Sequence, residues 1–534
     1  MSSSPNLITY TSMASHDSLI AENPKQGRGV RFWLIFLGLC VSLFLSALDS
    51  SAVYNALPVI VNDLQGTQFT WIGTAYNLAS AAFLPMSGCA AEIFGRRTAF
   101  VCALVAFALG SALCGSAKSM TWLIAARTVQ GVGGGAILSL ASIVVSDMVS
   151  LAERGTYNGF IGLTWAFAMA IGPVVGGSFA QTGNWRWLFY INLPISGMAM
   201  CLVLLFMDLP TPPGTLKEKL ARMDWIGNAL VMSSTTSLVI GLTWGGVLYP
   251  WTSPRVIVPL VLGICGLIAF LFYEARCATN PMVPRVLLTN RTTISGYLQN
   301  FCNSLGVMSC IYYFPVYFQA CKDALPIRSG IDMFGVTFVV GPFIVFGGLS
   351  VTKLQRYRPQ LWLGWVASIL GAGGFSTVGA DTNIGVGIGV PALWAAGGGI
   401  LFAATYFPVL SPLPVSANAH ALAFFAFLRA FALIWAVTIG SAILTNQLAI
   451  WLPSDFIASI PGGASNIYAI IPEIRNLPEP LKSEVQQAFS QSLRPLWYTA
   501  VGILVVGFIA SLAMQDVPLH NYIDEKWAME RRSS

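Results

Sequence analysis

Two charged side chains inside apolar segments are the first candidates for chemistry in this sequence. Asp49 lies in the segment Leu48–Pro58, and Arg127 is followed closely by Gln130 and a run of glycines. A carboxylate within a membrane costs on the order of a few kcal/mol unless it meets water, a partner or a proton, so Asp49 could carry a proton. Arginine keeps its proton in proteins, so Arg127 could tune that carboxyl, hold an anionic substrate or pin two helices together. The alternatives are a solvated helix-end carboxylate for Asp49 and a purely structural role for Arg127.

A short segment rich in glycine and charge is a candidate gating loop. Its residues are Gly88, Glu92, Gly95, Arg96 and Arg97. Glycine allows a tight turn between two helices, and Glu92 could form a charge network with Arg96 or Arg97. The alternative is that the two arginines only anchor the chain at the inner face of a membrane.

A glycine-proline segment further along the chain predicts close packing of helices. It contains Gly172, Pro173, Gly176 and Gly177. Proline lacks a backbone donor and glycine lacks a side chain, so we expect a kink and a tight approach to a neighbouring helix. The glycines after Gln130 match the spacing of a dinucleotide-binding fingerprint, but that motif requires a preceding strand. They lie within an apolar helix, so we expect helix packing there and no nucleotide.

Several classes of chemistry are excluded by the sequence. No lysine directly follows a glycine, so the phosphate-binding loop of ATPases is absent, as are the His-Glu-x-x-His metal motif and the Gly-x-Ser-x-Gly nucleophile motif. The three histidines are scattered, and the ten cysteines contain no Cys-x-x-Cys pair. The net charge of +6 is dispersed and includes no long basic run. We therefore expect no enzyme activity, no cofactor, no metal site and no nucleic-acid partner.

Membrane helices are the elements that would position these residues. Hydrophobic residues make up 55% of the 534 residues and charged residues only 9%, so lipid must be the solvent for much of the chain. Backbone groups in lipid bond within their own segment, which predicts an all-α polytopic membrane protein. Fourteen apolar runs are long enough to cross about 30 Å of hydrocarbon, near residues 32–56, 69–90, 98–117, 121–146, 157–181, 185–208, 225–247, 255–274, 292–320, 329–350, 361–380, 385–410, 419–447 and 495–515.

The placement of lysine and arginine predicts the orientation of these spans. With a cytoplasmic N-terminus, most of the 28 Lys and Arg residues fall on the cytoplasmic side, as the positive-inside rule requires. Both termini are then expected in the cytoplasm. The first thirty residues are polar and contain no cleavable signal, so the first apolar run is expected to remain as a span. The long outer loop is predicted to contain a short amphipathic helix from Leu481 to Ser492, interpreted as a surface helix rather than a lid.

Four motifs occur in a fixed order along the chain. They are the Asp49 motif in span 1, the segment Gly88–Arg97 between spans 2 and 3, the Arg127 motif in span 4 and the segment Gly172–Gly177 in span 5. The segment Trp185–Pro194 follows at the start of span 6. On these motifs, and over nearly its whole length, the sequence resembles the major facilitator superfamily, specifically the fourteen-span drug:proton antiporters of fungi.

The sequence also departs from the usual pattern of that family at three positions. Glu92 stands where the family usually has aspartate, Ile93 where it usually has a basic residue, and Ala168 in place of the first glycine of the span 5 motif. These departures affect local details of the gating loop and of the span 5 motif.

The resemblance implies a domain organisation. Two six-helix bundles would enclose a central cavity, with two further helices inserted between them, and substrate would bind near the middle of the membrane while the bundles rock. The expected divisions are a polar tail 1–30, an N-terminal bundle 31–208, inserted helices 209–291, a C-terminal bundle 292–515 with its outer loop 448–494, and a tail 516–534.

The resemblance also implies a function. We expect proton-coupled efflux of a hydrophobic or amphipathic small molecule, such as a drug, toxin, secondary metabolite or glycolipid, with Asp49 and Arg127 in the proton path. The candidates for the substrate cavity are Gln130, Trp165 and Asn303. The expected partners are the small-molecule substrate, protons and lipid, for a monomer in the plasma membrane or, alternatively, a vacuolar or other internal membrane. The alternatives are proton-coupled uptake of a siderophore or nutrient, and a membrane receptor or sensor that does not transport.

Overall fold

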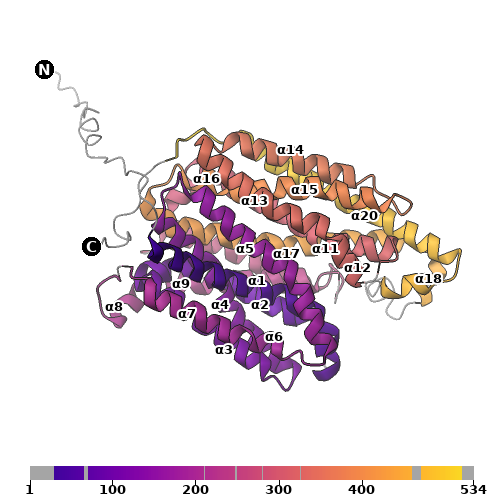
Figure 1. Cartoon of the computed structure of the whole chain (residues 1–534), viewed down its shortest axis with the longest axis horizontal. Coiled ribbons are helices and arrows are strands. Elements are labelled where there is room, and N and C mark those ends of the chain that lie inside the picture. Colours follow the sequence, from indigo (N-terminus) through magenta and orange to yellow (C-terminus); the bar gives the residue numbers. More distant parts are fainter. Residues whose placement is uncertain are drawn as a thin grey trace.

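The computed structural model describes residues 29–64, 70–209, 211–246, 249–279, 281–324, 326–459 and 471–519, and these residues are almost entirely helical (Figure 1). Long apolar runs satisfy their backbone groups within one helix, which explains this composition. Within those ranges the structure contains an isolated bridge between Gly245 and Tyr249 and no strand. The predicted all-α fold is confirmed. The expected tails lie almost entirely outside the described residues.

The N-terminal helices pack mainly on one another. Helix α1 packs on α5 and α7, and α4 packs on α2 and α3. These helices occupy the lower part of Figure 1 in indigo and purple. Their bounds are α1 (Val30–Leu64), α2 (Thr70–Phe94), α3 (Arg96–Gly115), α4 (Met120–Met148), α5 (Arg154–Gln181), α6 (Trp187–Tyr190) and α7 (Asn192–Phe206). We refer to α1–α7 as the N-terminal half.

The C-terminal helices form a second group. Helix α11 packs on α17 and α20, while α15 packs on α13 and α14. The bounds are α11 (Arg291–Cys321), α12 (Pro326–Asp332), α13 (Phe334–Leu354), α14 (Arg358–Phe375), α15 (Ile384–Ala404), α16 (Tyr406–Leu410), α17 (Asn418–Trp451), α18 (Ser454–Ser459) and α20 (Leu481–Leu512). We refer to α11–α20 as the C-terminal half.

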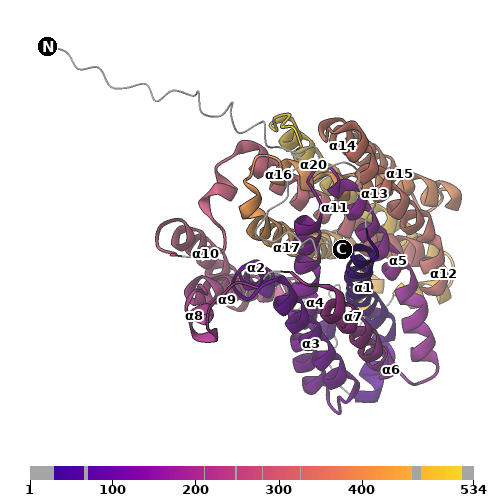
Figure 2. The ribbon, with the colours of Figure 1, turned by 60° about the vertical axis from the view of Figure 1, so that its left-hand side comes forward.

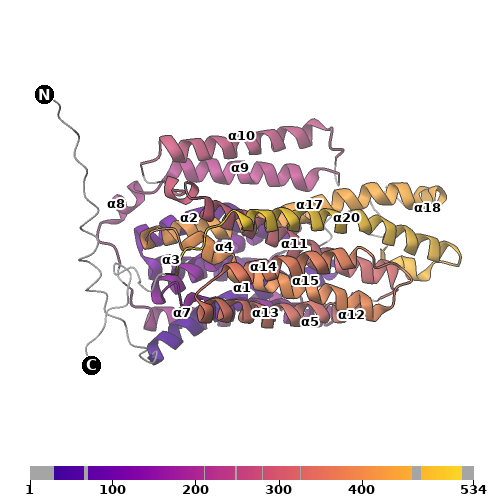
Figure 3. The same cartoon turned by 90° about the horizontal axis from the view of Figure 1, so that it is seen from above.

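A helical hairpin lies between the two halves in the sequence and beside them in space. The short helix α8 (Leu216–Ala221) leads into α9 (Trp225–Trp244) and α10 (Pro254–Arg276), which pack on each other. Figure 3 shows α9 and α10 at one side of the molecule, with α9 next to the rest. Helix α9 contacts α2 and α17, so the hairpin touches both halves through one helix.

The number of membrane spans is tested in part. Each of the fourteen expected runs falls on one helix or on two consecutive helices. By length and composition, eleven helices in the described chain could cross a membrane. The three remaining expected spans fall on α2, α11 and α14. The total of fourteen therefore stays a prediction.

Helices occupy both ends of the outer loop expected before the last span. The structure extends α17 to Trp451 and starts α20 at Leu481, so the predicted loop 448–494 includes helical residues at both ends. The segment interpreted as a separate surface helix is the first part of α20. Its Val485 and Phe489 side chains are fully buried, because the apolar face of this amphipathic segment packs into the C-terminal half.

An aromatic cluster lies in the core of the C-terminal half. Phe314, Phe375, Trp394 and Trp497 are each at most 2% exposed. The ring centroids of Phe314 and Phe375 are 4.4 Å apart, and those of Phe375 and Trp497 are 5.0 Å apart. Tilted and edge-on pairs of this kind contribute about 0.5–1.5 kcal/mol each beyond the area that they bury. Aromatic contacts therefore link α11, α14, α15 and α20.

The two halves meet through small residues. A Cβ atom on Gly155 of α5 would overlap with the carbonyl of Gly348 on α13, and the reverse also holds. A Cβ atom on Gly88 of α2 would come within 2.8 Å of the Cβ atom of Ala423 on α17. Figure 2 shows α5 beside α13 from a second direction. The absence of side chains lets these helices approach with their backbones nearly in contact.

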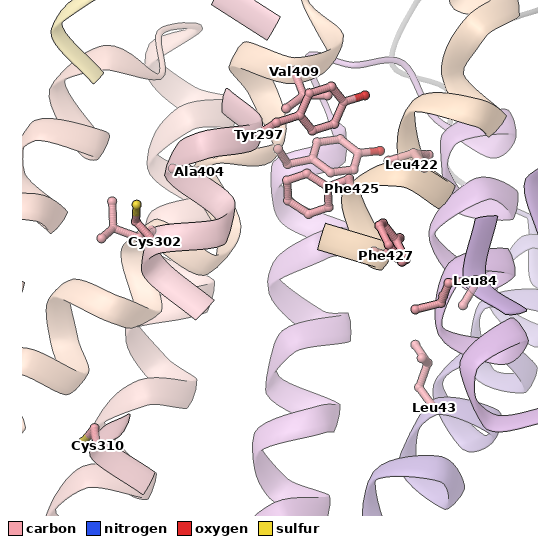
Figure 4. Packing of buried hydrophobic residues seen from close by; sticks show 14 of the residues in the cluster. Leu43, Leu84, Tyr297, Cys302, Cys310, Ala404, Val409, Leu422, Phe425 and Phe427 are labelled. Carbon is pink, nitrogen blue, oxygen red and sulfur yellow. The ribbon is translucent and has the colours of Figure 1, made fainter. Parts of the chain in front are cut away.

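A shared apolar core continues from these contacts. One cluster of buried side chains includes residues of both halves, and Figure 4 shows Leu84 of α2 and Phe427 of α17 among them. All the close contacts between the halves named above involve the second part of α2, the first part of α5, the second part of α13 and the first part of α17. Since consecutive spans alternate in direction, these parts belong to the same end of the bundle. The halves are therefore joined at that end.

Candidate functional site

Asp49 and Arg127 form a buried ion pair in the N-terminal half. Asp49 projects from the middle of α1 and Arg127 from the first part of α4, and their Oδ2 and NH1 atoms are 2.5 Å apart. The two residues are 2% and 1% exposed. Glycines also bring α4 close to α2, because a Cβ atom on Gly131 or Gly134 of α4 would overlap with Tyr76 of α2. The structure thus brings together the two charges that the sequence analysis singled out.

Two amides complete the environment of the carboxylate. Gln130 Nε2 and Asn192 Nδ2 each donate to Asp49 Oδ1 at 2.8 Å. The Ser111 hydroxyl accepts from the same two amides, at 2.8 and 3.3 Å. Both carboxylate oxygens therefore have donors, supplied by α4 and α7, with Ser111 of α3 behind them. Four helices of the N-terminal half converge on one carboxylate.

Arg127 is fixed by α2 as well as by Asp49. Its Nε atom donates to the carbonyl of Ile72 at 3.1 Å, and its guanidinium lies 4.4 Å from the centre of the Tyr76 ring. The Tyr76 hydroxyl is 2.9 Å from the Ser46 hydroxyl on α1. A delocalised cation over an aromatic face is stabilised by the ring quadrupole. Arg127 therefore ties α4 to α2 and, through Tyr76, back to α1.

Asn192, Ser111 and Tyr76 were not identified from the sequence as parts of this site. Asn192 lies in the segment Trp185–Pro194, which had been noted only as a motif. Each is a polar side chain in a largely apolar run, and a buried polar side chain needs partners. Many other polar side chains of this chain also lie in apolar runs, so this pattern alone does not single out the three residues. The sequence does not give the rotation of α3 and α7 that directs Ser111 and Asn192 at Asp49.

The glycine-proline segment of α5 packs against α1 directly after Asp49. A Cβ atom on Gly172 would overlap with the Ser51 hydroxyl, and one on Gly176 would overlap with the carbonyl of Ala52. Gly177 has open space, with nothing within 4 Å of a Cβ atom placed there. The segment lies within the single helix α5, and the kink expected at Pro173 stays a prediction. Gly172 and Gly176 are therefore the residues of this segment that pack closely on α1.

The candidate gating loop is almost wholly helical. Gly88 and Glu92 lie in α2, and α3 starts at Arg96, so Gly95 alone connects the two helices. Its φ of +90° is one that residues with side chains rarely adopt. Glu92 Oε1 lies 3.3 Å from Nδ1 of His420 on α17. Glu92 therefore reaches across to the C-terminal half, a contact that the sequence did not indicate.

The two arginines of this segment bind within the N-terminal half. Arg96 is 2% exposed and donates from Nε to Asp147 Oδ2 of α4 at 2.8 Å and from NH1 to the carbonyl of Ala91 at 3.0 Å. Arg97 donates to the carbonyl of Leu204 at the end of α7. Asp147 was not singled out in the sequence, although it is an acid at the end of an apolar run. The arginines fasten α3 to α4 and α7 at the end where the halves are joined.

The three candidates for the substrate cavity lie in different surroundings. Gln130 is fully buried inside the Asp49 network. Trp165 of α5 stacks on Phe402 of α15, with ring centroids 6.1 Å apart, so it lies at the contact between the halves. Asn303 of α11 is 2% exposed, and its Oδ1 atom has no hydrogen-bond partner. Of the three, Trp165 is the one that contacts both halves.

A cation lies beside that tryptophan contact. Arg429 of α17 donates from Nε to Asn300 Oδ1 at 3.1 Å and from NH2 to the carbonyl of Phe402 at 3.3 Å. Its guanidinium is 3.9 Å from the centre of the Phe402 ring. Arg429 lies within the expected span 419–447, and the sequence gives no indication of its neighbours. Arg429 and Trp165 therefore both contact the ring of Phe402.

Comparison with known proteins identifies relatives over nearly the full length. A sequence profile of the Major Facilitator Superfamily matches residues 39–437. The chain is 37% identical to the MFS-type efflux pump LUC4 of a Fusarium species, over 99% of this chain and 96% of that protein. It is 38% identical to the efflux pump FUS6 of Gibberella fujikuroi, over 94% and 92%, and 36% identical to the MFS-type efflux pump MMF1 of Pseudozyma antarctica, over 96% of each.

Solved structures share the fold at low sequence identity. The human organic anion transporter MFSD10 superposes with a TM-score of 0.57 at 13% identity, over 91% of this chain and 100% of that one. The proton:xylose symporter XylE gives the same TM-score and identity, over 89% and 94%. At this identity the likeness concerns the arrangement of helices alone.

Proposed function

This chain belongs to the Major Facilitator Superfamily of membrane transporters, and we propose that it exports a hydrophobic or amphipathic small molecule in exchange for protons. The substrate class that we propose comprises secondary metabolites, toxins, drugs and glycolipids. The protein would act as a monomer in the plasma membrane, with both termini in the cytoplasm. The observation that carries the proposal is the buried Asp49–Arg127 pair, in a chain with three nearly full-length relatives that are named efflux pumps.

The direction of transport is supported by the relatives and by the glycine-proline segment. Three relatives that match more than nine tenths of this chain are named efflux pumps. The segment resembles the antiporter motif, and its Gly172 and Gly176 pack on α1 within a turn of Asp49. A change in the position of α1 at Asp49 would therefore be transmitted directly to α5. Helix α5 in turn contacts α13 in the other half.

Proton coupling is supported by the electrostatics of the pair. In the present arrangement both oxygens of Asp49 accept hydrogen bonds, one of them from the Arg127 guanidinium. A proton arriving at Asp49 would cancel the ion pair and leave the Arg127 charge with Gln130 Oε1, 2.6 Å from its NH1 atom. That would weaken the link between α1 and α4. Each proton entering the cell supplies about 2.3 kcal/mol per 100 mV of membrane potential, in addition to the pH gradient.

The present conformation fits one stage of such a cycle. The halves are joined at the end that carries the Gly95 turn and the start of α5. In the predicted topology this is the cytoplasmic end, so we propose that the structure is closed to the cytoplasm. Binding of a proton at Asp49 would then favour release of the contacts between α2 and α17 and between α5 and α13.

Transport in reconstituted vesicles tests the proposal. A panel of hydrophobic and amphipathic compounds is offered to vesicles with an acidic lumen, in which an antiporter concentrates its substrate. The Asp49→Asn variant should bind the same compound but fail to concentrate it. Accumulation that requires an acidic exterior instead would indicate uptake by symport, and binding without accumulation under either gradient would indicate a receptor. Either result would overturn the proposed export.

A charge-neutral variant separates coupling from folding. Asp49→Asn combined with Arg127→Gln removes the pair without leaving a lone charge. If the pair couples protons to transport, this double variant stays folded and carries substrate down its gradient, but it does not respond to pH. Wild-type accumulation in the double variant would place the coupling site elsewhere.

A further inference from the structure

Two carboxyl groups meet at the base of the α9–α10 hairpin, outside both halves. Asp224 precedes α9, and its Oδ1 atom accepts from the Gly227 backbone N–H at 2.8 Å and from the Tyr273 hydroxyl at 3.2 Å. Glu274 lies in the last turn of α10, and its Oε2 atom accepts from the Val283 backbone N–H at 3.1 Å. Each carboxylate thus has one oxygen occupied by donors. These contacts fasten the start of α9 and the end of α10 to the connector that leads to α11.

The second oxygen of each carboxyl is buried and has no donor. Asp224 and Glu274 are 8% and 4% exposed, and Asp224 Oδ2 and Glu274 Oε1 have no hydrogen-bond partner. Both oxygens point to one place, because a Cβ atom on Gly227 would overlap with each of them. A Cβ atom on Gly227 would lie 2.3 Å from Asp224 Oδ2 and 2.6 Å from Glu274 Oε1, so the two oxygens flank the same small space. Asn228, which is 3% exposed, adds a further acceptor without a partner, its Oδ1 atom.

The surroundings provide no positive charge to this pair. In the described part of the chain, no Lys, Arg or His side chain donates a hydrogen bond to Asp224 or Glu274 or forms an ion pair with either. The titratable groups that face them are the Tyr273 hydroxyl, the Cys277 thiol beside it, and the Cys89 thiol on α2. Beyond Cys89 lies His420 of α17, whose Nε2 atom is 3.7 Å from Cys89 Sγ and whose Nδ1 atom is 3.3 Å from Glu92 Oε1. None of the groups that face the two carboxyls directly is a cation. Two carboxylates in contact and out of water cannot both stay ionised without a positive partner.

We propose that Asp224 and Glu274 share one proton and form a second proton site, distinct from Asp49 and Arg127. The proton lies between Asp224 Oδ2 and Glu274 Oε1 and satisfies both oxygens at once. Its loss leaves two like charges facing each other where α9, α10 and the connector to α11 meet. The attachment of the hairpin to the C-terminal half therefore depends on pH. This site is independent of the proposed export, since it requires neither a substrate nor a transport cycle.

Glu274→Gln imitates the protonated pair permanently. The glutamine oxygen can accept from Val283 while its amide donates to Asp224, so the hydrogen-bond pattern is kept without a proton. Thermal unfolding of the purified full chain is followed from mildly acidic to mildly alkaline pH. The wild-type Tm should fall as pH rises and the proton leaves, whereas Glu274→Gln should lose that part of the fall. Glu484→Gln, which changes an exposed glutamate in the first turn of α20, should behave as wild type.

Infrared difference spectra give a second readout. The wild type should show a protonated-carboxyl C=O band that is absent from Glu274→Gln. Asp224→Asn, which keeps a side chain suited to cap α9, should remove the same band and serves if Glu274→Gln does not fold. If neither variant folds, a wild-type spectrum without such a band at acidic pH overturns the proposal.

Two further outcomes overturn it. One is a pH dependence of Tm in Glu274→Gln equal to that of the wild type. The other is a rise in wild-type Tm on adding Mg²⁺ or Ca²⁺ at constant ionic strength, absent in Glu274→Gln, since the pair would then hold a cation instead of a proton.

Discussion

Asp49 and Asp63 show how one residue type serves two purposes on the same helix. Asp49 is buried and holds Arg127, Gln130 and Asn192 with both oxygens. Asp63, close to the end of α1, has a side chain that is 47% exposed. Removing the Asp49 carboxylate would leave Arg127 as a lone charge in an apolar interior, which lowers stability strongly. An exposed ion pair, such as that of Asp63 with Arg186, contributes little to stability.

The first prediction concerns stability at Asp49. Asp49→Asn should lower the free energy of unfolding by about 3–5 kcal/mol, because Arg127 would remain buried without a counter-charge. The double change of Asp49→Asn with Arg127→Gln should recover most of this loss. Unfolding of the purified protein in detergent measures both. A double variant that is no more stable than Asp49→Asn would show that the lone charge is not the cause.

The second prediction concerns pH at Asp63. Hydrogen bonds from Trp185 Nε1, at 3.0 Å, and from Arg186 NH1, at 2.8 Å, hold the pKa of Asp63 below its ordinary value of 3.8. The contribution is present above that value and is lost as pH falls through the lowered pKa. Asp63→Asn should therefore reduce stability at neutral pH, by less than about 1 kcal/mol. Tm measured against pH should show the two proteins converging in acid, and a constant difference would contradict this.

Part of the Asp49 site could be predicted from individual residues of the sequence, and part could not. Asp49 and Arg127 are conspicuous because charge in an apolar run demands an explanation, and they do meet. Asn192 and Ser111 were missed because many polar residues lie in the apolar runs of this chain, and only the rotation of each helix selects those that face Asp49. For the same reason the contact of Glu92 with His420 was missed, since it depends on how the two halves pack.

Helix α5 shows what glycine does at the scale of an element. Three of its glycines lie in one short segment, yet only Gly172 and Gly176 are pressed against α1. The sequence predicted the tight approach from composition alone but treated all positions of the segment alike. Likewise, the helix expected from Leu481 was separated from the last span because its first turns are polar, although their buried face already follows the helical period and the structure continues both as α20.

The third prediction compares two glycines of this helix. Gly172→Ala should lower both stability and transport, since its methyl group would overlap with the Ser51 hydroxyl and push α5 away from α1. Gly177→Ala is the matched control: its methyl group meets open space, and alanine favours a helix by up to about 1 kcal/mol over glycine. Thermal unfolding and vesicle transport are measured for both. Equal effects of the two substitutions would refute the packing explanation.

At the scale of the whole molecule, the halves differ in how their centres are held. The N-terminal half converges on charges and amides around Asp49, while the C-terminal half converges on four aromatic rings. The sequence predicted the helices and, through the family resemblance, their grouping. It could not show which end of the bundle is closed, because that depends on contacts between residues almost two hundred positions apart, such as Gly155 and Gly348.

The fourth prediction tests the orientation of the chain. Asn290 begins a glycosylation sequon with Thr292, and its Oδ1 atom accepts from the Thr292 N–H at 2.8 Å at the start of α11. In the predicted topology this residue faces the cytoplasm, so it should carry no glycan when the protein is made in a eukaryotic cell. Glycosidase treatment followed by gel mobility checks this. A mobility shift that disappears in Asn290→Gln would place α9 and α10 the other way round.

The tryptophans of the aromatic cluster should give an optical signal distinct from that of exposed tryptophans. Trp394 and Trp497 are at most 2% exposed, whereas Trp33, Trp187 and Trp225 are 47–57% exposed on the N-terminal half and the hairpin. The buried pair should fluoresce at shorter wavelength and resist aqueous quenchers, while brominated lipids should quench the exposed group. Light emission thus separates buried tryptophans, which include Trp185 before α6, from exposed ones, which include Trp451 of α17, without any added label.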